Sequence, residues 1–209
     1  MIIPKGVNMK EIFFMRHSEP LKPVYLHNKE PLQLQNEKWP LTINGEKMAN
    51  ERSQQPELQD FDIVISSNYV RAISTAKYFA KDKLFIDDNF GERKFGINNW
   101  DEMPKDFGKK QFDDFNYKLP NGESINEVIE REYNALINIL NNYHNKKILI
   151  VGHATALASL FSKWCKIDKN NRYSFNNKIF FNGKWNYCET FKLQFDNNNK
   201  LIDIENIKF

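Results

Sequence analysis

Five ionisable side chains in this sequence each follow a short apolar run. They are Arg16 and His17 after residues 12–15, Arg71 after residues 61–65, Glu92 after residues 84–86 and His153 after residues 148–151. Short runs rich in Ile, Val and Phe that stop at polar residues are typical of buried strands. In an open α/β sheet, ligands bind just outside the carboxyl ends of the strands. We therefore expect these five side chains to converge at one edge of a sheet.

This set of charges predicts phosphoryl transfer without a metal ion. Arginine presents a planar fork of donors that matches phosphate oxygens, and Arg16 and Arg71 can fill this role. Positive neighbours disfavour a charged histidine, so its pKa should fall and leave a neutral imidazole that can attack phosphorus. Because phosphoryl transfer needs mainly positioning and charge neutralisation, a second imidazole, His153, can assist. Glu92 can protonate the departing alkoxide and then activate water.

Some assignments near this set stay open from the residues alone. Asp87, Asp88 and Glu19 are neighbours that could replace Glu92 as the acid. Arg93 could bind substrate or be a surface charge, and we do not count it in the site. No His-x-x-x-His pair and no paired Cys and His indicate zinc, so we expect neither a metal nor another cofactor.

The elements that must position these groups alternate between strand and helix. Further strands are expected over residues 61–65, 84–86 and 147–151, and helices over residues 44–54, 69–80 and 155–164. Residues 66–68 are good N-caps for the second of these helices. Ser124 and Glu127 form a capping box that begins the clearest helix, whose apolar spacing continues to Leu140. Four alternations call for a mainly parallel sheet with right-handed crossovers.

The end of the chain differs, because residues 187–195 and 201–207 predict a closing antiparallel hairpin. The expected fold is α/β, a three-layer sandwich with a mainly parallel sheet flanked by helices and this C-terminal hairpin. One domain over residues 1–209 is the better prediction, because no composition break marks a boundary.

Three segments stand apart from this pattern. Residues 1–8 are expected to be a dispensable extension, since Met9 directly precedes the first strand and translation could begin at Met1 or Met9. Residues 19–41 contain four prolines and are expected to form a long loop. Loops of that length are often lids. We treat residues 19–40 and residues 93–120 as lid or insertion segments, and expect only short helical turns in the second.

Composition excludes several classes of protein. A hydrophobic content of 41% with 17 Phe suffices for a core, and a net charge of +3 without a long basic run argues against nucleic acid or an anionic membrane as partner. No run reaches the roughly 18 apolar residues of a membrane span. Two cysteines without a C-x-x-C fit buried thiols in a reducing compartment. We therefore expect a soluble cytoplasmic protein that acts on a small partner, and its oligomeric state stays open.

Several segments, in order and spacing, resemble the histidine phosphatase superfamily, also called the phosphoglycerate mutase-like family. They are residues 14–19 (FMRHSE), 40–42 (PLT) with Gly45, 66–72 (SSNYVRA) with 75–76 (TA), 90–93 (FGER) with 95–96 (FG), 121–124 (NGES) and 151–154 (VGHA). The agreement runs from about residue 9 to residue 165. One such motif would be weak, but a series of them in the family order is a strong signal.

The resemblance implies a role for each candidate residue. His17 would be the phosphorylated nucleophile, Arg16, Arg71 and His153 would hold the phosphoryl group, and Glu92 would donate the proton. It also implies hydrolysis of a small phosphorylated metabolite with no metal in this step. A phosphoglycerate mutase is one alternative, although residues 93–122 are short for the insertion that mutases usually carry. A non-catalytic phosphate-binding module is another, which the filled catalytic positions disfavour.

The loop after the nucleophile departs from the family pattern. Ser18 replaces the usual glycine, and Pro20 stands where a small hydroxyl residue is common. Pro23 occupies the position of an asparagine that touches phosphate in many members. Ser18 can still form hydrogen bonds, whereas Pro20 lacks a backbone donor. We therefore expect this loop to be built differently around the same catalytic residues.

Overall fold

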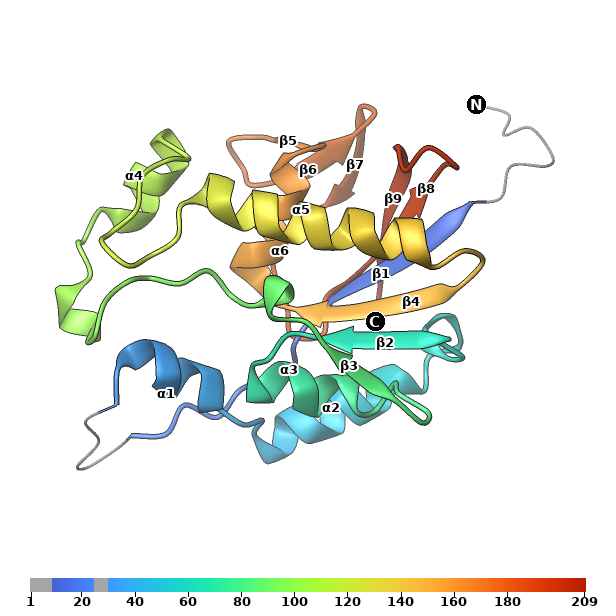
Figure 1. Cartoon of the computed structure of the whole chain (residues 1–209), viewed down its shortest axis with the longest axis horizontal. Helices are drawn as coiled ribbons and strands as arrows, with labels where there is room; N and C mark the ends of the chain where they lie inside the picture. The colour runs from blue at the N-terminus through green and yellow to red at the C-terminus, as the bar shows by residue number, and fades with distance from the viewer. Residues whose placement is uncertain (1–8, 25–29) are drawn as a thin grey trace.

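The computed structural model describes residues 9–24 and 30–209, and its main element is a six-stranded sheet (Figure 1). The strand order is β3-β2-β4-β1-β8-β9. The strands are β1 Lys10–Arg16, β2 Ile63–Ser66, β3 Leu84–Ile86, β4 Lys147–Gly152, β8 Thr190–Phe195 and β9 Leu201–Ile207. The first four pair in parallel, while β8 and β9 form an antiparallel hairpin that pairs with β1. The expected mainly parallel sheet with a C-terminal hairpin is thus confirmed.

Helices cover both faces of this sheet (Figure 1): α5 (Ile125–Asn142) and α6 (Ala154–Ser162) lie on one side, α2 (Ile43–Ser53) and α3 (Val70–Ala76) on the other. Successive side chains of a strand point to opposite faces. In β1, Ile12 and Phe14 therefore join the core under α5 and α6, whereas Phe13 and Met15 join the core under α2 and α3. The continuous apolar run of β1 is explained by burial on both faces, and the expected three-layer arrangement is confirmed.

Local signals in the sequence set the starts of two helices. Thr42 caps α2 by accepting a hydrogen bond from the Gly45 backbone N–H, and Ser124 and Glu127 form the expected capping box of α5. A Cβ on Gly45 would lie 2.3 Å from the Glu19 carbonyl oxygen. Only glycine therefore lets α2 approach the loop that leaves β1.

Two predictions between β1 and β3 were wrong in part. The loop expected over residues 19–41 contains a helix, α1 (Leu32–Lys38). The helix expected over residues 69–80 is shorter, because α3 ends at Ala76, and none of residues 66–68 caps it. Its N-cap is Tyr69, whose side chain makes no capping bond. The Ser67 hydroxyl is instead bonded to His153.

A second sheet, missing from the sequence prediction, lies between α6 and β8. It is antiparallel, in the order β5-β6-β7, with β5 Lys166–Ile167, β6 Tyr173–Phe175 and β7 Lys178–Phe181. Asn176 and Asn177 connect β6 to β7 with φ of 47° and 64°. Two central residues at positive φ are typical of a type I′ hairpin turn, for which asparagine is suited. The Asn-Asn pair could therefore have predicted this hairpin turn from the sequence.

The remaining segments are short. The insertion, residues 93–120, contains the short helices η3 (Trp100–Glu102) and α4 (Phe107–Asp113), as expected, and η1 (Pro56–Leu58) and η2 (Asp88–Phe90) lie elsewhere. The proposed extension, residues 1–8, lies outside the described residues, and a single domain over residues 1–209 stays a prediction. Among the described residues, no helix has the length and apolar character needed to cross a bilayer.

Candidate active site

His17 is fixed by groups from several elements at the carboxyl end of β1. Its backbone N–H donates to the Gly152 carbonyl at 2.9 Å, and its side chain is only 5% exposed. Its Nδ1 lies 2.6 Å from the Ser18 carbonyl oxygen. Because a carbonyl can only accept, Nδ1 carries the hydrogen and Nε2 holds the lone pair. A neutral His17 therefore carries its ring lone pair on Nε2.

Arg71 connects the two histidines. Its Nε donates to His17 Nε2 at 3.1 Å and its Nη2 to His153 Nδ1 at 3.2 Å. Its Nη1 donates to the Asn36 carbonyl of α1 at 2.5 Å, and its guanidinium lies 4.6 Å from the centre of the Tyr69 ring. The second position of α3 thus places a buried cation between the carboxyl ends of β1 and β4.

His153 follows β4 and is the N-cap residue of α6. It is fully buried, and its ring centre lies 5.1 Å from that of His17. Its Nε2 lies 2.8 Å from the Ser67 hydroxyl, while Nδ1 accepts from Arg71. Nε2 therefore donates to Ser67 in the neutral tautomer, and Nδ1 faces the same guanidinium as His17 Nε2.

Arg16 is held by a turn that precedes β8. Its Nη1 donates to the Trp185 carbonyl, and its guanidinium lies 4.5 Å from the centre of the Tyr187 ring. That ring is 6.4 Å from the His17 ring. Cys188 has φ of 55°, a strained backbone conformation for a residue with a side chain. The strained turn brings Tyr187 against Arg16, so the C-terminal segment forms one wall of the site.

Glu92 lies between the arginines and the amino end of α6. Its Oε1 accepts hydrogen bonds from the Ala156 N–H at 3.1 Å and from the Arg93 N–H at 2.9 Å. Burial lowers the pKa of Arg16 and of Arg71, and the Glu92 carboxylate opposes this lowering in both. The acid predicted from the sequence is thus close to both cations. Glu19, one of its possible replacements, instead accepts hydrogen bonds from Thr42 and Asn44.

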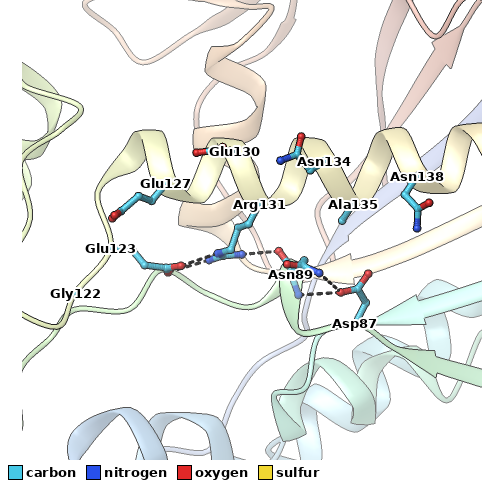
Figure 2. Close-up of a pocket in the computed structure, with 10 residues that line it drawn as sticks. All are labelled: Asp87, Asn89, Gly122, Glu123, Glu127, Glu130, Arg131, Asn134, Ala135 and Asn138. Atoms are coloured by element: carbon cyan, nitrogen blue, oxygen red, sulfur yellow. Dashed lines mark hydrogen bonds and ion pairs between the residues drawn. The ribbon is translucent and has the colours of Figure 1, made fainter.

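The loop that carries Glu92 is clamped from α5 (Figure 2). Arg131 pairs with Glu123 at 2.7 Å and donates to the Asn89 carbonyl at 2.5 Å. Glu123 also accepts from the Lys94 N–H at 2.9 Å. Asn89, Glu123 and Arg131 line a surface groove of about 690 Å³, and none of the five predicted residues lines it. Arg131 and Glu123 thus hold the loop on both sides of Glu92, at Asn89 and at Lys94. We call this pair the clamp.

Burial and positive neighbours keep both histidines neutral. Burial lowers the pKa of His17 well below its usual value, and Arg71 and then Arg16 lower it further. The pKa of His153 is lowered for the same reasons, with burial first and Arg71 second. The Ser18 carbonyl opposes the shift at His17 but is outweighed. A neutral imidazole with its lone pair on Nε2 is the form that attacks phosphorus.

The departures after the nucleophile are accommodated locally. Ser18 is fully buried; its N–H donates to Thr75 Oγ1 at 2.9 Å and its hydroxyl to the Gly45 carbonyl at 2.7 Å. Pro20, which lacks a donor, forms an isolated antiparallel bridge with Leu41. Ser18, in the place of the usual glycine, therefore connects the end of β1 to α2 and α3 by hydrogen bonds.

Several groups that contact the predicted residues were missed. They are the Asn36 carbonyl, the Tyr69 ring, the Ser67 hydroxyl, the Trp185 carbonyl and the Tyr187 ring. Ser67, Tyr69 and Tyr187 contribute side chains, which a sequence can show, whereas a backbone carbonyl is common to all residue types. Within the described part of the chain, no group of three or more His, Cys, Asp or Glu side chains is arranged to hold a metal ion.

One curated protein is similar to this chain in sequence. A protein of Bacillus subtilis (strain 168) named uncharacterized phosphatase PhoE is 32% identical over 128 residues, which are 59% of this chain and 64% of that protein. The match thus spans less than two thirds of the relative's length.

Two solved structures share the fold. Mycobacterial hydrolase 1 superposes with a TM-score of 0.69 at 15% identity, covering 96% of this chain and all of its own. A mutant phosphoserine phosphatase of Entamoeba histolytica, in complex with phosphoserine, superposes with a TM-score of 0.63 at 19% identity. The superposition covers 93% of this chain and 96% of that one. A sequence model of the histidine phosphatase superfamily (branch 1) matches residues 12–201. The chain belongs to this superfamily, as its motifs predicted.

Proposed function

We propose that this protein is a phosphatase that hydrolyses a small phosphorylated metabolite through a phosphohistidine on His17. The observation that carries this proposal is the tautomer of His17. Its Nδ1–H is committed to the Ser18 carbonyl, so the Nε2 lone pair lies beside the Arg71 guanidinium in a site that disfavours protonation. Membership of the superfamily supports the same chemistry.

In the first step, Nε2 attacks phosphorus and the bond from phosphorus to the ester oxygen breaks. Arg16, Arg71 and His153 surround the phosphoryl group, and the Arg71 donors that meet the two imidazoles turn to its oxygens. Protonated Glu92 gives its proton to the leaving oxygen. The products are the alcohol, the phosphohistidine and the Glu92 carboxylate.

In the second step, the Glu92 carboxylate takes a proton from water, and the water oxygen attacks phosphorus. The bond from phosphorus to Nε2 breaks and inorganic phosphate leaves, which restores neutral His17 and protonated Glu92. The chain supplies every group that these steps use, and no metal ion takes part in them.

The cellular setting is part of the proposal. Cys165 and Cys188 are free and buried, which suits a reducing compartment such as the cytoplasm. The mild net charge favours a small metabolite over nucleic acid as the partner.

Phosphate release from a panel that includes p-nitrophenyl phosphate and sugar phosphates tests this function. We expect turnover by the wild type, no turnover by His17→Ala with an unchanged circular dichroism spectrum, and an acid-labile phosphoryl group on His17 after rapid quenching. An active His17→Ala protein would contradict the mechanism. Conversion of 3- to 2-phosphoglycerate without release would replace the phosphatase by a mutase, and no release from any ester would favour a binding module.

A further inference from the structure

A cavity of about 200 Å³ lies between the insertion, the start of α5, α6 and β6, and Arg93, the residue after Glu92, lines it. We call it the Arg93 cavity. Its lining is mostly apolar, with Arg93 as its charged residue; its walls include Arg93, Phe112, Phe115, Ile125, Ala158 and Tyr173. Arg93 and Thr155 line it. The backbone N–H of Arg93 and that of Ala156, the residue after Thr155, both donate to Glu92 Oε1. The chain segments that hold the Glu92 carboxylate thus also form two walls of the cavity.

The insertion holds the Arg93 guanidinium in place. Nη1 donates to the Gln111 side-chain oxygen, and the guanidinium lies 5.0 Å from the Phe95 ring centre and 5.2 Å from the Phe107 ring centre. Gln111 is itself buried, and its Nε2 donates to the Tyr117 carbonyl at 2.9 Å and to the Glu123 carbonyl at 3.0 Å. The cation is thus positioned before any ligand arrives.

No carboxylate neutralises this cation directly. Across residues 9–24 and 30–209, no ion pair is formed by Arg93, and its buried Nε has no hydrogen-bond partner. Glu92 and Glu123 act on it only through their more distant charges. A buried charge without a carboxylate partner is costly. An anionic ligand in the cavity would neutralise the guanidinium.

We propose that the Arg93 cavity binds the leaving group of the substrate, and that this leaving group carries a carboxylate on a small apolar body. The inference rests on the proposed function, because Glu92 must contact the ester oxygen and so brings the leaving group to the cavity. Arg93 pairs with the carboxylate while Phe112, Phe115 and Tyr173 contact the body. The volume is below the roughly 300–1,000 Å³ of drug-sized pockets, which selects a small acid rather than a nucleotide.

The test compares phenyl phosphate with 3- and 4-carboxyphenyl phosphate, which add a carboxylate to the same body at two distances. Dissociation constants are measured by calorimetry on the His17→Ala protein, which binds without turnover, and kcat/KM is measured on the wild type. We expect at least one carboxylated ester to bind about 10- to 100-fold more tightly than phenyl phosphate, as for a charge-assisted ion pair. Arg93→Met in the same background should reduce this ratio to about one, and Arg93→Lys should keep part of it.

Lys109→Met is the matched control, because it removes a positive charge from α4 at an exposed side chain that pairs with Asp113. It should leave the binding ratio unchanged. Equal binding of all three esters, or a preference that survives Arg93→Met, would overturn the inference. If the wild type hydrolyses none of the esters while the Arg93-dependent preference persists, the proposed function fails and the binding site stands.

Discussion

Replacing Arg71 by methionine removes a charge and three hydrogen bonds from the centre of the site while keeping an apolar stem. Two of its donors, Nε and Nη2, now meet His17 and His153 and are the ones free to turn to phosphoryl oxygens, whereas Nη1 is held by the Asn36 carbonyl. A hydrogen bond that involves a charged group contributes about 1.5–3 kcal/mol. Losing two should lower kcat/KM by roughly 10²- to 10⁴-fold.

The same change should alter the pH dependence. Arg71 is the second cause, after burial, of the lowered pKa of His17 and of His153. Without it, both pKa values rise towards the usual 6.5 but stay below it, because burial remains. Neutral His17 exists only above its pKa, so the acid limb of the profile of kcat/KM against pH should move to higher pH.

Hydrolysis of p-nitrophenyl phosphate across a pH series measures both effects, and titration of the histidines by NMR checks the pKa change directly. Arg172→Met is the control, because Arg172 forms an exposed ion pair with Asp168 at 2.8 Å; it should leave kcat/KM unchanged. A loss of less than tenfold in Arg71→Met, or an acid limb that moves to lower pH, would refute the reasoning.

Arg131→Met should reduce kcat several-fold with little change in KM, because the Asn89 carbonyl loses the donor that fixes the loop of the acid; steady-state kinetics check this, and an unchanged kcat would count against the clamp. Burial raises the pKa of Glu132 well above its usual value, and neither carboxylate oxygen has a partner within the described chain. The folded state therefore binds more protons than the unfolded state above about pH 4.5, and stability falls as pH rises. Glu132→Gln cannot ionise, so the free energy of unfolding of the variant minus that of the wild type should increase with pH, by up to about 1.4 kcal/mol per pH unit. Urea denaturation at several pH values measures this difference, and a difference that does not change with pH would contradict the prediction. Tyr187→Leu should raise KM about 2- to 5-fold by removing a ring contact with Arg16 worth about 0.5–1 kcal/mol, and an unchanged KM would show that the ring is dispensable.

Much of the fold followed from the sequence because local signals and tertiary packing agree. The apolar run of β1 indicated burial on both faces, and its residues do alternate between two cores. The capping box at Ser124 marked the start of α5. The strand ends then located the five candidate residues, since parallel strands deliver their carboxyl ends to one edge.

Other parts of the site and fold could not be predicted, because they depend on groups that no particular residue type reveals. Arg71 and Arg16 are each held by a backbone carbonyl, from Asn36 and from Trp185, and any residue could supply one. Helix α1 lacked an apolar stripe and lay among prolines, so its pattern favoured a loop. Arg93 could not be assigned because its environment exists only once the insertion brings Gln111 against its guanidinium.

Strand β1 occupies the middle of the sheet, yet both of its neighbours are made late. Those neighbours, β4 and β8, begin at Lys147 and Thr190. At about 5–20 residues per second, a ribosome needs roughly ten to thirty seconds to proceed from β1 to β8. Until β8 is made, β1, whose apolar residues are buried on both faces in the folded protein, lacks at least one of its two neighbours. A nascent chain that has not reached residues 185–187 also lacks the carbonyl and the ring that hold Arg16.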